Sequence, residues 1–193
     1  MRWLEASRTI RRMSLRIAAD VLIRTLVVLD TETTGFYPEA GDEIIELAAE
    51  KLINGIVVDT FQALIIPSRP IPAEATAVHG LDDAYIRVHG LAPADVFPNF
   101  AAFAGNAILV GHNIRRFDLP FLATHFLAVG LPAPEHELID TLELARASLA
   151  LPNYKLGTIA THFGISITGA HRAAADVAIT RKVLLHLLDK VER

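Results

Sequence analysis

The sequence predicts an α/β fold with a mixed five-stranded sheet flanked by helices, and three observations support it. Two apolar segments, Glu43–Ile53 and Ile56–Ile66, flank an Asn-Gly pair, which is a strong signal for an antiparallel hairpin. Short apolar strands then alternate with helical patterns in the second half of the chain, as they do where helices join parallel strands. At 193 residues, the chain has the length of one ordinary domain.

Each further element follows from its local pattern. The first strand is predicted over Thr25–Leu29, an apolar and partly β-branched run. Prolines at positions 67, 70 and 72 predict a loop after the hairpin. Helices are predicted where apolar residues recur at helical spacing, and a proline in the first turn or a glycine after the last supports them. The remaining strands are predicted at Ala107–Gly111 and Leu138–Asp140, and helices at Phe97–Ala104, Leu119–Val129, Thr141–Leu149, Lys155–Phe163 and Arg172–Val191.

The composition excludes several classes of protein. With 52% hydrophobic and 21% charged residues, the chain can bury a core, which excludes a disordered or low-complexity protein. It contains no cysteine, which excludes disulfides, thiolate metal sites and cysteine nucleophiles. No apolar stretch is long enough to cross a membrane, and no secretory signal is evident. A cytoplasmic location without a membrane partner is therefore expected.

The first 24 residues differ in charge from the rest of the chain. They hold six arginines and two acidic residues, a net charge of +4. Because the whole chain carries −4, residues 25–193 carry −8. Apolar residues at helical spacing between the arginines predict an amphipathic helix in this basic extension. Two interpretations stay open: a contact with nucleic acid or a membrane surface, or a helix that packs on the domain formed by residues 25–193.

Two acidic residues follow the first predicted strand in the run Asp30-Thr31-Glu32. Side chains two positions apart on a strand point to the same face, so Asp30 and Glu32 converge. Neighbouring carboxylates repel each other unless a positive charge lies between them. In a chain without cysteine, a hard cation such as Mg²⁺ or Mn²⁺ is the natural candidate. The alternative is an exposed acidic strand end without function.

Two later segments add three more candidates. Asp118 follows Gly111-His112-Asn113 at a strand-to-helix junction, where it is either a metal ligand or a helix N-cap. His171 and Asp176 are five residues apart, which places them about 140° apart on a helix. They converge only if His171 lies in the loop before the helix. That arrangement sets an imidazole, which is suited to proton transfer near neutral pH, beside a metal ligand.

The order D-T-E-T-T-G-F, H-N-x₃-F-D and H-R-A-A-A-D resembles the DEDDh 3′→5′ exonucleases of the ribonuclease H-like fold. Within that family it is most similar to the proofreading epsilon subunits of bacterial DNA polymerase III. The resemblance covers roughly residues 25–190, and Val78-His79-Gly80-Leu81 and Tyr154-Lys155-Leu156 fit it as well. One departure is visible: three residues, not two, separate Asn113 from Phe117.

The resemblance implies a ribonuclease H-like exonuclease domain over residues 25–193 and a site with two divalent cations, Mg²⁺ or Mn²⁺. Asp30, Glu32 and Asp176 would hold the ion that activates the attacking water. Asp30 and Asp118 would hold the ion that stabilises the leaving oxygen. His171 would be the general base. The expected catalytic residues are therefore Asp30, Glu32, Asp118, His171 and Asp176.

The resemblance also implies the substrate. Thr33, Thr34 and Gly35 would admit the terminal sugar, and His79 and Asn113 would contact the terminal nucleotide. Single-stranded or frayed DNA 3′ ends are the expected substrate, and nucleoside 5′-monophosphates the product. Two alternatives stay open: an exoribonuclease acting on short RNA, and a non-catalytic module that binds nucleic acid or a polymerase. A polymerase or a second copy of the chain is a candidate partner.

Overall fold

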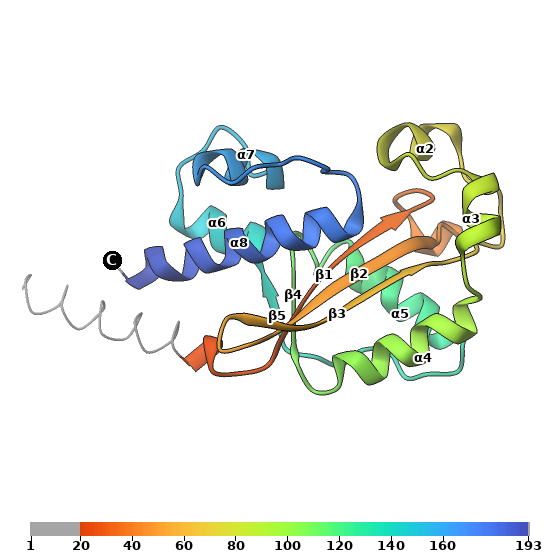
Figure 1. Cartoon of the computed structure of the whole chain (residues 1–193), viewed down its shortest axis with the longest axis horizontal. Helices are drawn as coiled ribbons and strands as arrows, with labels where there is room; N and C mark the ends of the chain where they lie inside the picture. The colour runs from red at the N-terminus through yellow and green to blue at the C-terminus, as the bar shows by residue number, and fades with distance from the viewer. Residues whose placement is uncertain (1–19, 193) are drawn as a thin grey trace, which may run out of the picture.

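Five strands form one mixed sheet in the computed structural model, which describes residues 20–192 (Figure 1). The strand order is β3-β2-β1-β4-β5. β1 is antiparallel to β2 and parallel to β4, and β4 is parallel to β5. The predicted mixed sheet is confirmed. The strands are β1 (Leu26–Thr33), β2 (Ile44–Ile53), β3 (Ile56–Leu64), β4 (Ile108–Gly111) and β5 (Leu138–Asp140).

The predicted hairpin joins β2 and β3. Asn54 and Gly55 have φ values of 53° and 74°. Positive φ at both central residues is the geometry that a two-residue hairpin turn favours, and these two residue types tolerate it best. β1 continues four residues beyond the predicted end at Leu29, because Asp30 and Glu32 still pair with β2. Hydrophobicity marks only the part of the strand that is buried, whereas the ladder of backbone hydrogen bonds continues through polar residues.

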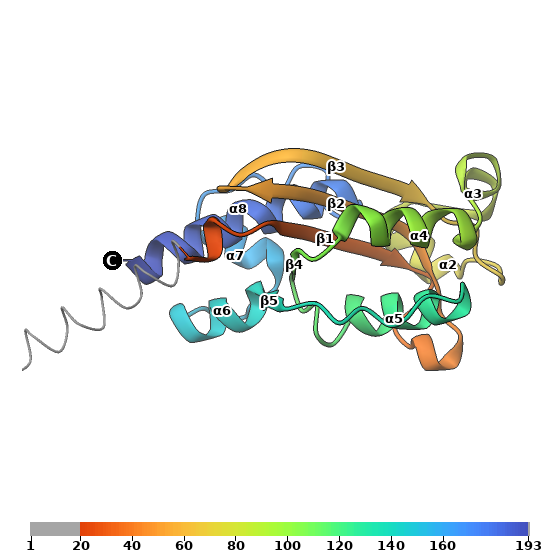
Figure 2. The same cartoon turned by 90° about the horizontal axis from the view of Figure 1, so that it is seen from below.

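Helices cover both faces of the sheet, as the view from below shows (Figure 2). Because side chains alternate along β1, Val27 and Leu29 belong to the core under α4 and α5, whereas Leu26 and Val28 face α8. Asp30 and Glu32 continue the α8 face. The long helices are α4 (Pro93–Ala104), α5 (Asp118–Ala128), α6 (Thr141–Ser148) and α8 (Ala173–Glu192), and the seven-residue α7 (Leu156–His162) packs with α6 and α8.

Two short helices are missing from the prediction, α2 (Ala73–His79) and α3 (Asp83–His89). Each has seven residues, too few for helical periodicity to stand out. α3 begins at an Asp82 side chain that accepts a hydrogen bond from the Tyr85 N–H. α4 also begins at Pro93, four residues before its predicted start, with a proline at the first helical position. A short 3-10 turn, η1 (Pro38–Ala40), follows β1.

Most of the predicted basic extension, residues 1–19, lies outside the described residues. Within the described part, Val21 and Leu22 pack against the core beneath α8. This contact agrees with packing on the domain for these two residues. No helix among residues 20–192 combines the length and the apolar character needed to cross a membrane.

Candidate active site

Three carboxylates meet at the carboxyl end of β1. Asp30 and Glu32 lie on the face of β1 that α8 covers, and Asp176 lies in the first turn of α8. One oxygen atom from each lies within 4.8 Å of the other two. The three residues are partly exposed to solvent, which leaves the cluster accessible to an ion. Three carboxylate oxygens, one from each residue, therefore lie close enough together to be ligands of a single ion.

A fourth carboxylate, that of Asp118, lies near these three. It is the first residue of α5 and is 3% exposed. Phe117, and not Asp118, occupies the N-cap position of that helix. The Thr31 hydroxyl donates a hydrogen bond to Asp118 Oδ1 at 2.8 Å and holds the side chain in place. Asp118 is not part of the 4.8 Å set, but its charge acts on Asp30.

The carboxylates resist ionisation in the absence of a cation. Burial, together with the charges of Asp118 and Asp176, raises the pKa of Asp30 well above its usual range. Burial and the Asp176 charge raise the pKa of Glu32 to about 8. Burial raises the pKa of Asp118 to about 7, although the Thr31 hydrogen bond opposes it. A divalent cation would compensate these charges, and a set of carboxylate oxygens alone suits a hard ion such as Mg²⁺ or Mn²⁺.

His171 lies in the loop before α8, as the convergence with Asp176 requires. Its φ of 68° is unusual for a residue other than glycine. The His171 N–H donates a hydrogen bond to Asp176 Oδ2 at 3.0 Å, and the residue itself is exposed. The backbone of His171 therefore holds a metal-ligand candidate, while its ring is open to solvent beside that carboxylate.

The turn after β4 is held by Asp140, which the sequence motifs do not mark as a site residue. Asp140, at the end of β5, accepts hydrogen bonds from the N–H groups of Asn113 and Leu142, each at 2.9 Å. Asn113 adopts a φ of 69° there. His112 is fixed between the Thr141 hydroxyl and the Tyr154 carbonyl. Asp140, like Asp30, is an acidic residue at the carboxyl end of a strand. That pattern could have identified it from the sequence.

Some of the predicted substrate contacts are engaged within the protein. Thr33 donates to the Gly35 carbonyl at 2.6 Å, and the Thr34 hydroxyl accepts from the Glu43 N–H at 2.9 Å. A Cβ at Gly35 would lie 2.2 Å from the Asp42 carboxylate, so a larger residue here would displace the side chain that accepts a hydrogen bond from the Tyr37 N–H. His79 is 5% exposed, and its Nδ1 accepts from the Leu81 N–H at 3.0 Å.

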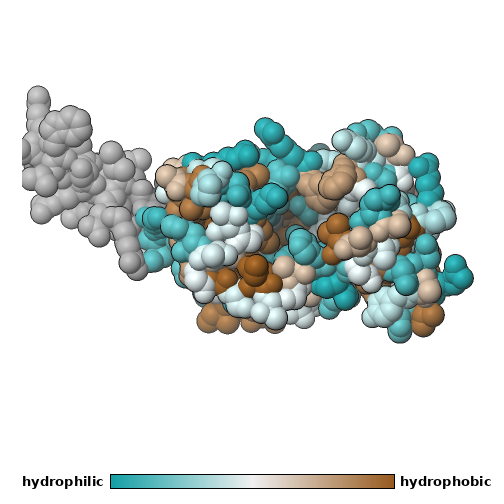
Figure 3. Space-filling view, turned by 90° about the horizontal axis from the view of Figure 1, so that it is seen from above, coloured by the Kyte–Doolittle hydropathy of each residue, from teal (hydrophilic) through white to brown (hydrophobic). Residues whose placement is uncertain are grey.

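One pocket opens at the carboxylates, at Asp176, and a second pocket adjoins it. One, of about 620 Å³, is lined by Thr158, Thr161, His171 and Asp176 among others. The other, of about 450 Å³, includes Asn113, Arg146 and Tyr154. Lys155 lines both, and no acidic residue lines the second. Figure 3 looks onto the face with α7 and α8, where hydrophilic and hydrophobic residues surround a hollow.

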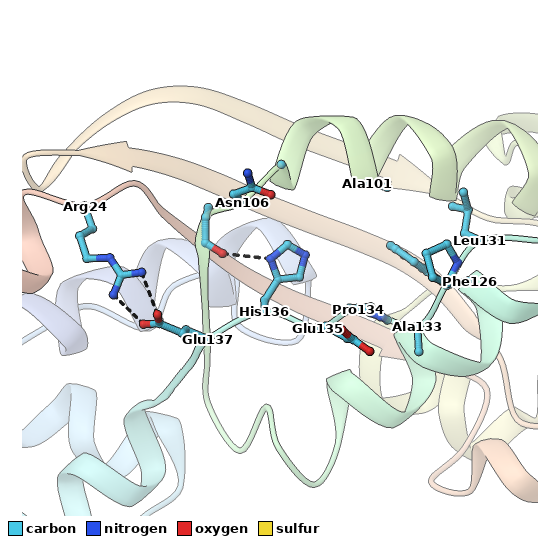
Figure 4. Close-up of a pocket in the computed structure, with 13 residues that line it drawn as sticks. Arg24, Ala101, Asn106, Phe126, Leu131, Ala133, Pro134, Glu135, His136 and Glu137 are labelled. Carbon is cyan, nitrogen blue, oxygen red and sulfur yellow. Dashed lines mark hydrogen bonds and ion pairs between the residues drawn. The ribbon is translucent and has the colours of Figure 1, made fainter.

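A third pocket, of about 600 Å³, lies at the opposite end of the sheet (Figure 4). Arg24, which precedes β1, donates to Glu137 at 2.6 and 3.0 Å. His136 Nδ1 donates to the carbonyl of Ala107, which precedes β4, at 3.0 Å. The pocket therefore lies at the amino ends of the strands, away from the carboxylates at their carboxyl ends.

Clustered carboxylates at the carboxyl end of a central strand, with a histidine beside them, are typical of enzymes that bind hard divalent ions through acidic side chains. The chain belongs to the exonuclease family: residues 27–184 match the family described as Exonuclease (RNase_T).

Curated relatives belong to DNA polymerase III systems. The chain is 38% identical over 167 residues to DNA polymerase III PolC-type of Caldanaerobacter subterraneus, covering 86% of this chain and 12% of the relative. It is 38% identical over 169 residues to the DNA polymerase III subunit epsilon-like protein of Rhodobacter capsulatus, covering 85% and 24%. The chain therefore spans less than a quarter of the length of these relatives.

Solved structures of exonuclease I share the fold. One aligns with a TM-score of 0.77 at 21% identity, over 86% of this chain and 42% of that chain. The E. coli enzyme in complex with a dT13 oligonucleotide aligns with a TM-score of 0.76 at 22% identity, over 86% and 41%. The predicted ribonuclease H-like fold is confirmed by this similarity.

Proposed function

We propose that this chain is a metal-dependent 3′→5′ exonuclease that removes nucleoside 5′-monophosphates from single-stranded or frayed DNA 3′ ends. The observation that carries the proposal is the cluster of Asp30, Glu32, Asp118 and Asp176, whose pKa values are all raised in the absence of a cation. Structural stability alone gives no reason to gather such groups, because each costs free energy when it ionises.

The proposed metal ligands divide into two sets. Asp30, Glu32 and Asp176 would hold one ion, and Asp30 and Asp118 the second. Two Mg²⁺ or Mn²⁺ ions bound there would supply stabilisation for the charge that develops on the attacking and leaving oxygens. The protein contributes the fixed positions of these side chains. β1 fixes Asp30 and Glu32, and the Thr31 hydroxyl fixes Asp118 at 2.8 Å.

His171 is the proposed general base, which takes the proton from the attacking water. Its loop position next to Asp176 and its exposed side chain support this role. Hydrolysis then breaks the bond between phosphorus and the 3′ oxygen of the preceding nucleotide. The phosphate stays on the released nucleotide as a 5′-monophosphate.

A nucleic-acid substrate fits the surface beside the cluster. Phe36 and Tyr37, directly after the D-T-E-T-T-G motif, are 74% and 62% exposed, and exposed aromatic rings suit base stacking. Lys155 and Arg146 line the adjoining pocket and suit phosphate contacts. Thr33, Thr34, Gly35, His79 and Asn113 remain the proposed contacts of the terminal nucleotide, with the Thr33–Gly35 loop contributing its backbone.

The relatives also bear on biological context. PolC-type and epsilon-like proteins are components named for DNA polymerase III, and the E. coli exonuclease I structure holds an oligonucleotide of thymidines. These names support DNA as the substrate of this chain and a polymerase as a partner. Proofreading is the proposed context.

The test uses 5′-labelled single-stranded and 3′-recessed oligonucleotides of DNA and RNA, with Mg²⁺, Mn²⁺ or a chelator. We expect metal-dependent shortening of DNA from the 3′ end. Asp176→Asn should lose this activity, and the exposed Glu39→Gln should keep it. Preferential digestion of RNA would favour the exoribonuclease, and binding without shortening would favour the non-catalytic module.

A further inference from the structure

A fifth acidic residue, Glu46, lies next to the carboxylate cluster. It stands on β2 directly opposite Glu32 in the antiparallel register and is 0% exposed. Its charge contributes to the raised pKa values of Asp30 and Glu32. Glu46 nevertheless does not belong to the set of carboxylates within 4.8 Å of one another.

The hydrogen bonds of Glu46 explain why it stands apart. Oε1 accepts from Arg172 Nη2 and Gln62 Nε2, each at 3.0 Å. Oε2 accepts from Arg172 Nε at 3.0 Å and from the Ala173 N–H at 3.3 Å. A carboxylate offers about four lone-pair positions, and here four donors occupy them. Glu46 therefore has no free position left for an ion.

Arg172 keeps this buried carboxylate charged. Burial alone would raise the pKa of Glu46, but the hydrogen bonds from Arg172 and Gln62 outweigh it and lower the pKa. Arg172 also opposes the rise in the pKa of Glu32. The bidentate ion pair with Arg172 thus compensates the negative charge of Glu46. The carboxylates beside Glu46 have no such compensation.

The segment that Glu46 anchors carries two proposed active-site residues. Arg172 and Ala173 follow His171, whose N–H binds Asp176 Oδ2. His171 has a positive φ, a conformation that persists only where the surroundings hold it. Three of the four hydrogen bonds to Glu46, two from Arg172 and one from Ala173, fix the start of α8 against β2 and so determine where both His171 and Asp176 stand.

We propose that Glu46 is a positioning residue of the active site: through its hydrogen bonds to Arg172 and Ala173 it fixes the start of α8, which orients His171 and Asp176 without binding the metal itself. The inference rests on the proposed nuclease function for its kinetic readout. It predicts that losing the charge of Glu46 impairs metal binding and turnover more than it impairs folding.

The chain supplies a matched control. Arg181 forms an ion pair with Glu50, which joins the same helix α8 to the same strand β2. Glu50 lies opposite Val28, away from the carboxylates. Glu46→Gln and Arg181→Gln therefore each remove one ion pair between α8 and β2, but only the first lies at the active site.

The experiment measures thermal unfolding, Mn²⁺ affinity of the substrate-free protein by calorimetry, and kcat and KM on single-stranded DNA. Replacing a residue that supports metal ligands typically costs about 10–100-fold in metal affinity or activity. We expect such a loss in Mn²⁺ affinity and kcat for Glu46→Gln with little change in KM, and less than about 2-fold for Arg181→Gln. Equal losses in the two variants, or unchanged Mn²⁺ affinity and kcat in Glu46→Gln, would overturn the proposal.

Arg172 provides a second route if Glu46→Gln does not fold, since its side chain is 42% exposed. Arg172→Gln should reproduce the loss, and Arg172→Lys should restore part of it because the charge returns without the bidentate geometry. Identical wild-type behaviour in both would contradict the proposal. If wild-type protein binds Mn²⁺ but digests no oligonucleotide, the proposed function fails, while the Mn²⁺ affinities still decide the role of Glu46.

Discussion

Replacing Glu32 with glutamine should stabilise the metal-free protein and reduce its gain in stability on metal binding. The pKa of Glu32 is raised from 4.5 to about 8 by burial and by the Asp176 charge. Between these two values the folded state binds the proton more tightly than the unfolded state. Ionised Glu32 therefore destabilises the folded state. This loss of stability is absent below pH 4.5 and grows until the pH passes about 8.

The size of this effect follows from the same interval. At about 1.4 kcal/mol per pH unit, the range from 4.5 to about 8 sets an upper limit of about 5 kcal/mol above pH 8. Glu32 keeps part of its surface in solvent, which screens its charge. We therefore expect Glu32→Gln to raise the free energy of unfolding by roughly 2 kcal/mol at high pH and by well under 1 kcal/mol near pH 5.

The assay is urea unfolding in chelator near pH 5 and near pH 8.5, with Glu39→Gln as an exposed control. Mn²⁺ at about 100 times its dissociation constant should then stabilise the wild type by about 2.7 kcal/mol. The same Mn²⁺ concentration should stabilise Glu32→Gln clearly less, because one ligand of the proposed first ion is lost. If the variant is less stable than wild type in chelator near pH 8.5, or gains equally from Mn²⁺, Glu32 is neither a destabilising anion nor a metal ligand.

Three further predictions concern single histidines and a turn. His171→Gln should lower the rate of hydrolysis in single-turnover assays by about 10²–10⁴-fold. Mn²⁺ affinity should stay unchanged, because the His171 backbone N–H, which the variant keeps, holds Asp176. An unchanged rate would exclude His171 as the base. His125 Nε2 accepts from the Ile44 N–H at 2.9 Å, and burial lowers its pKa below 6.5, so the folded state binds this proton less tightly than the unfolded state. The stability advantage of wild type over His125→Gln should be full above pH 6.5 and shrink below it in urea unfolding; a constant advantage would contradict this assignment. Asp140→Ala should cost about 1–2 kcal/mol in thermal unfolding and raise KM, because Asn113 loses its anchor; a stability loss with unchanged KM would separate Asn113 from substrate binding.

Patterns within a few consecutive residues predicted the parts of the site whose members are close in the sequence. Alternation along β1 was enough to bring Asp30 and Glu32 to one face, and a loop before α8 was enough to bring His171 to Asp176. The same rules located the hairpin at Asn54 and Gly55. In each case a few consecutive residues decide the geometry.

Contacts between distant segments could not be predicted in this way. Arg172 binds Glu46 across 126 positions, and Thr31 binds Asp118 across 87. These contacts depend on strand register and helix placement, which no short pattern encodes. A signal for Glu46 was nevertheless present, because it is a charged residue inside the apolar run of β2. A charge at such a position must have partners within the fold.

The central claim is that Asp30, Glu32 and Asp176 form the metal centre of this exonuclease-family chain. An anomalous difference map from crystals soaked in Mn²⁺ tests it most directly, because it locates the ion without reference to activity. We expect an anomalous peak for Mn²⁺ between these three carboxylates, with Glu46 still bound to Arg172. A peak elsewhere on the protein with none at this cluster, or a peak ligated by Glu46, would contradict it.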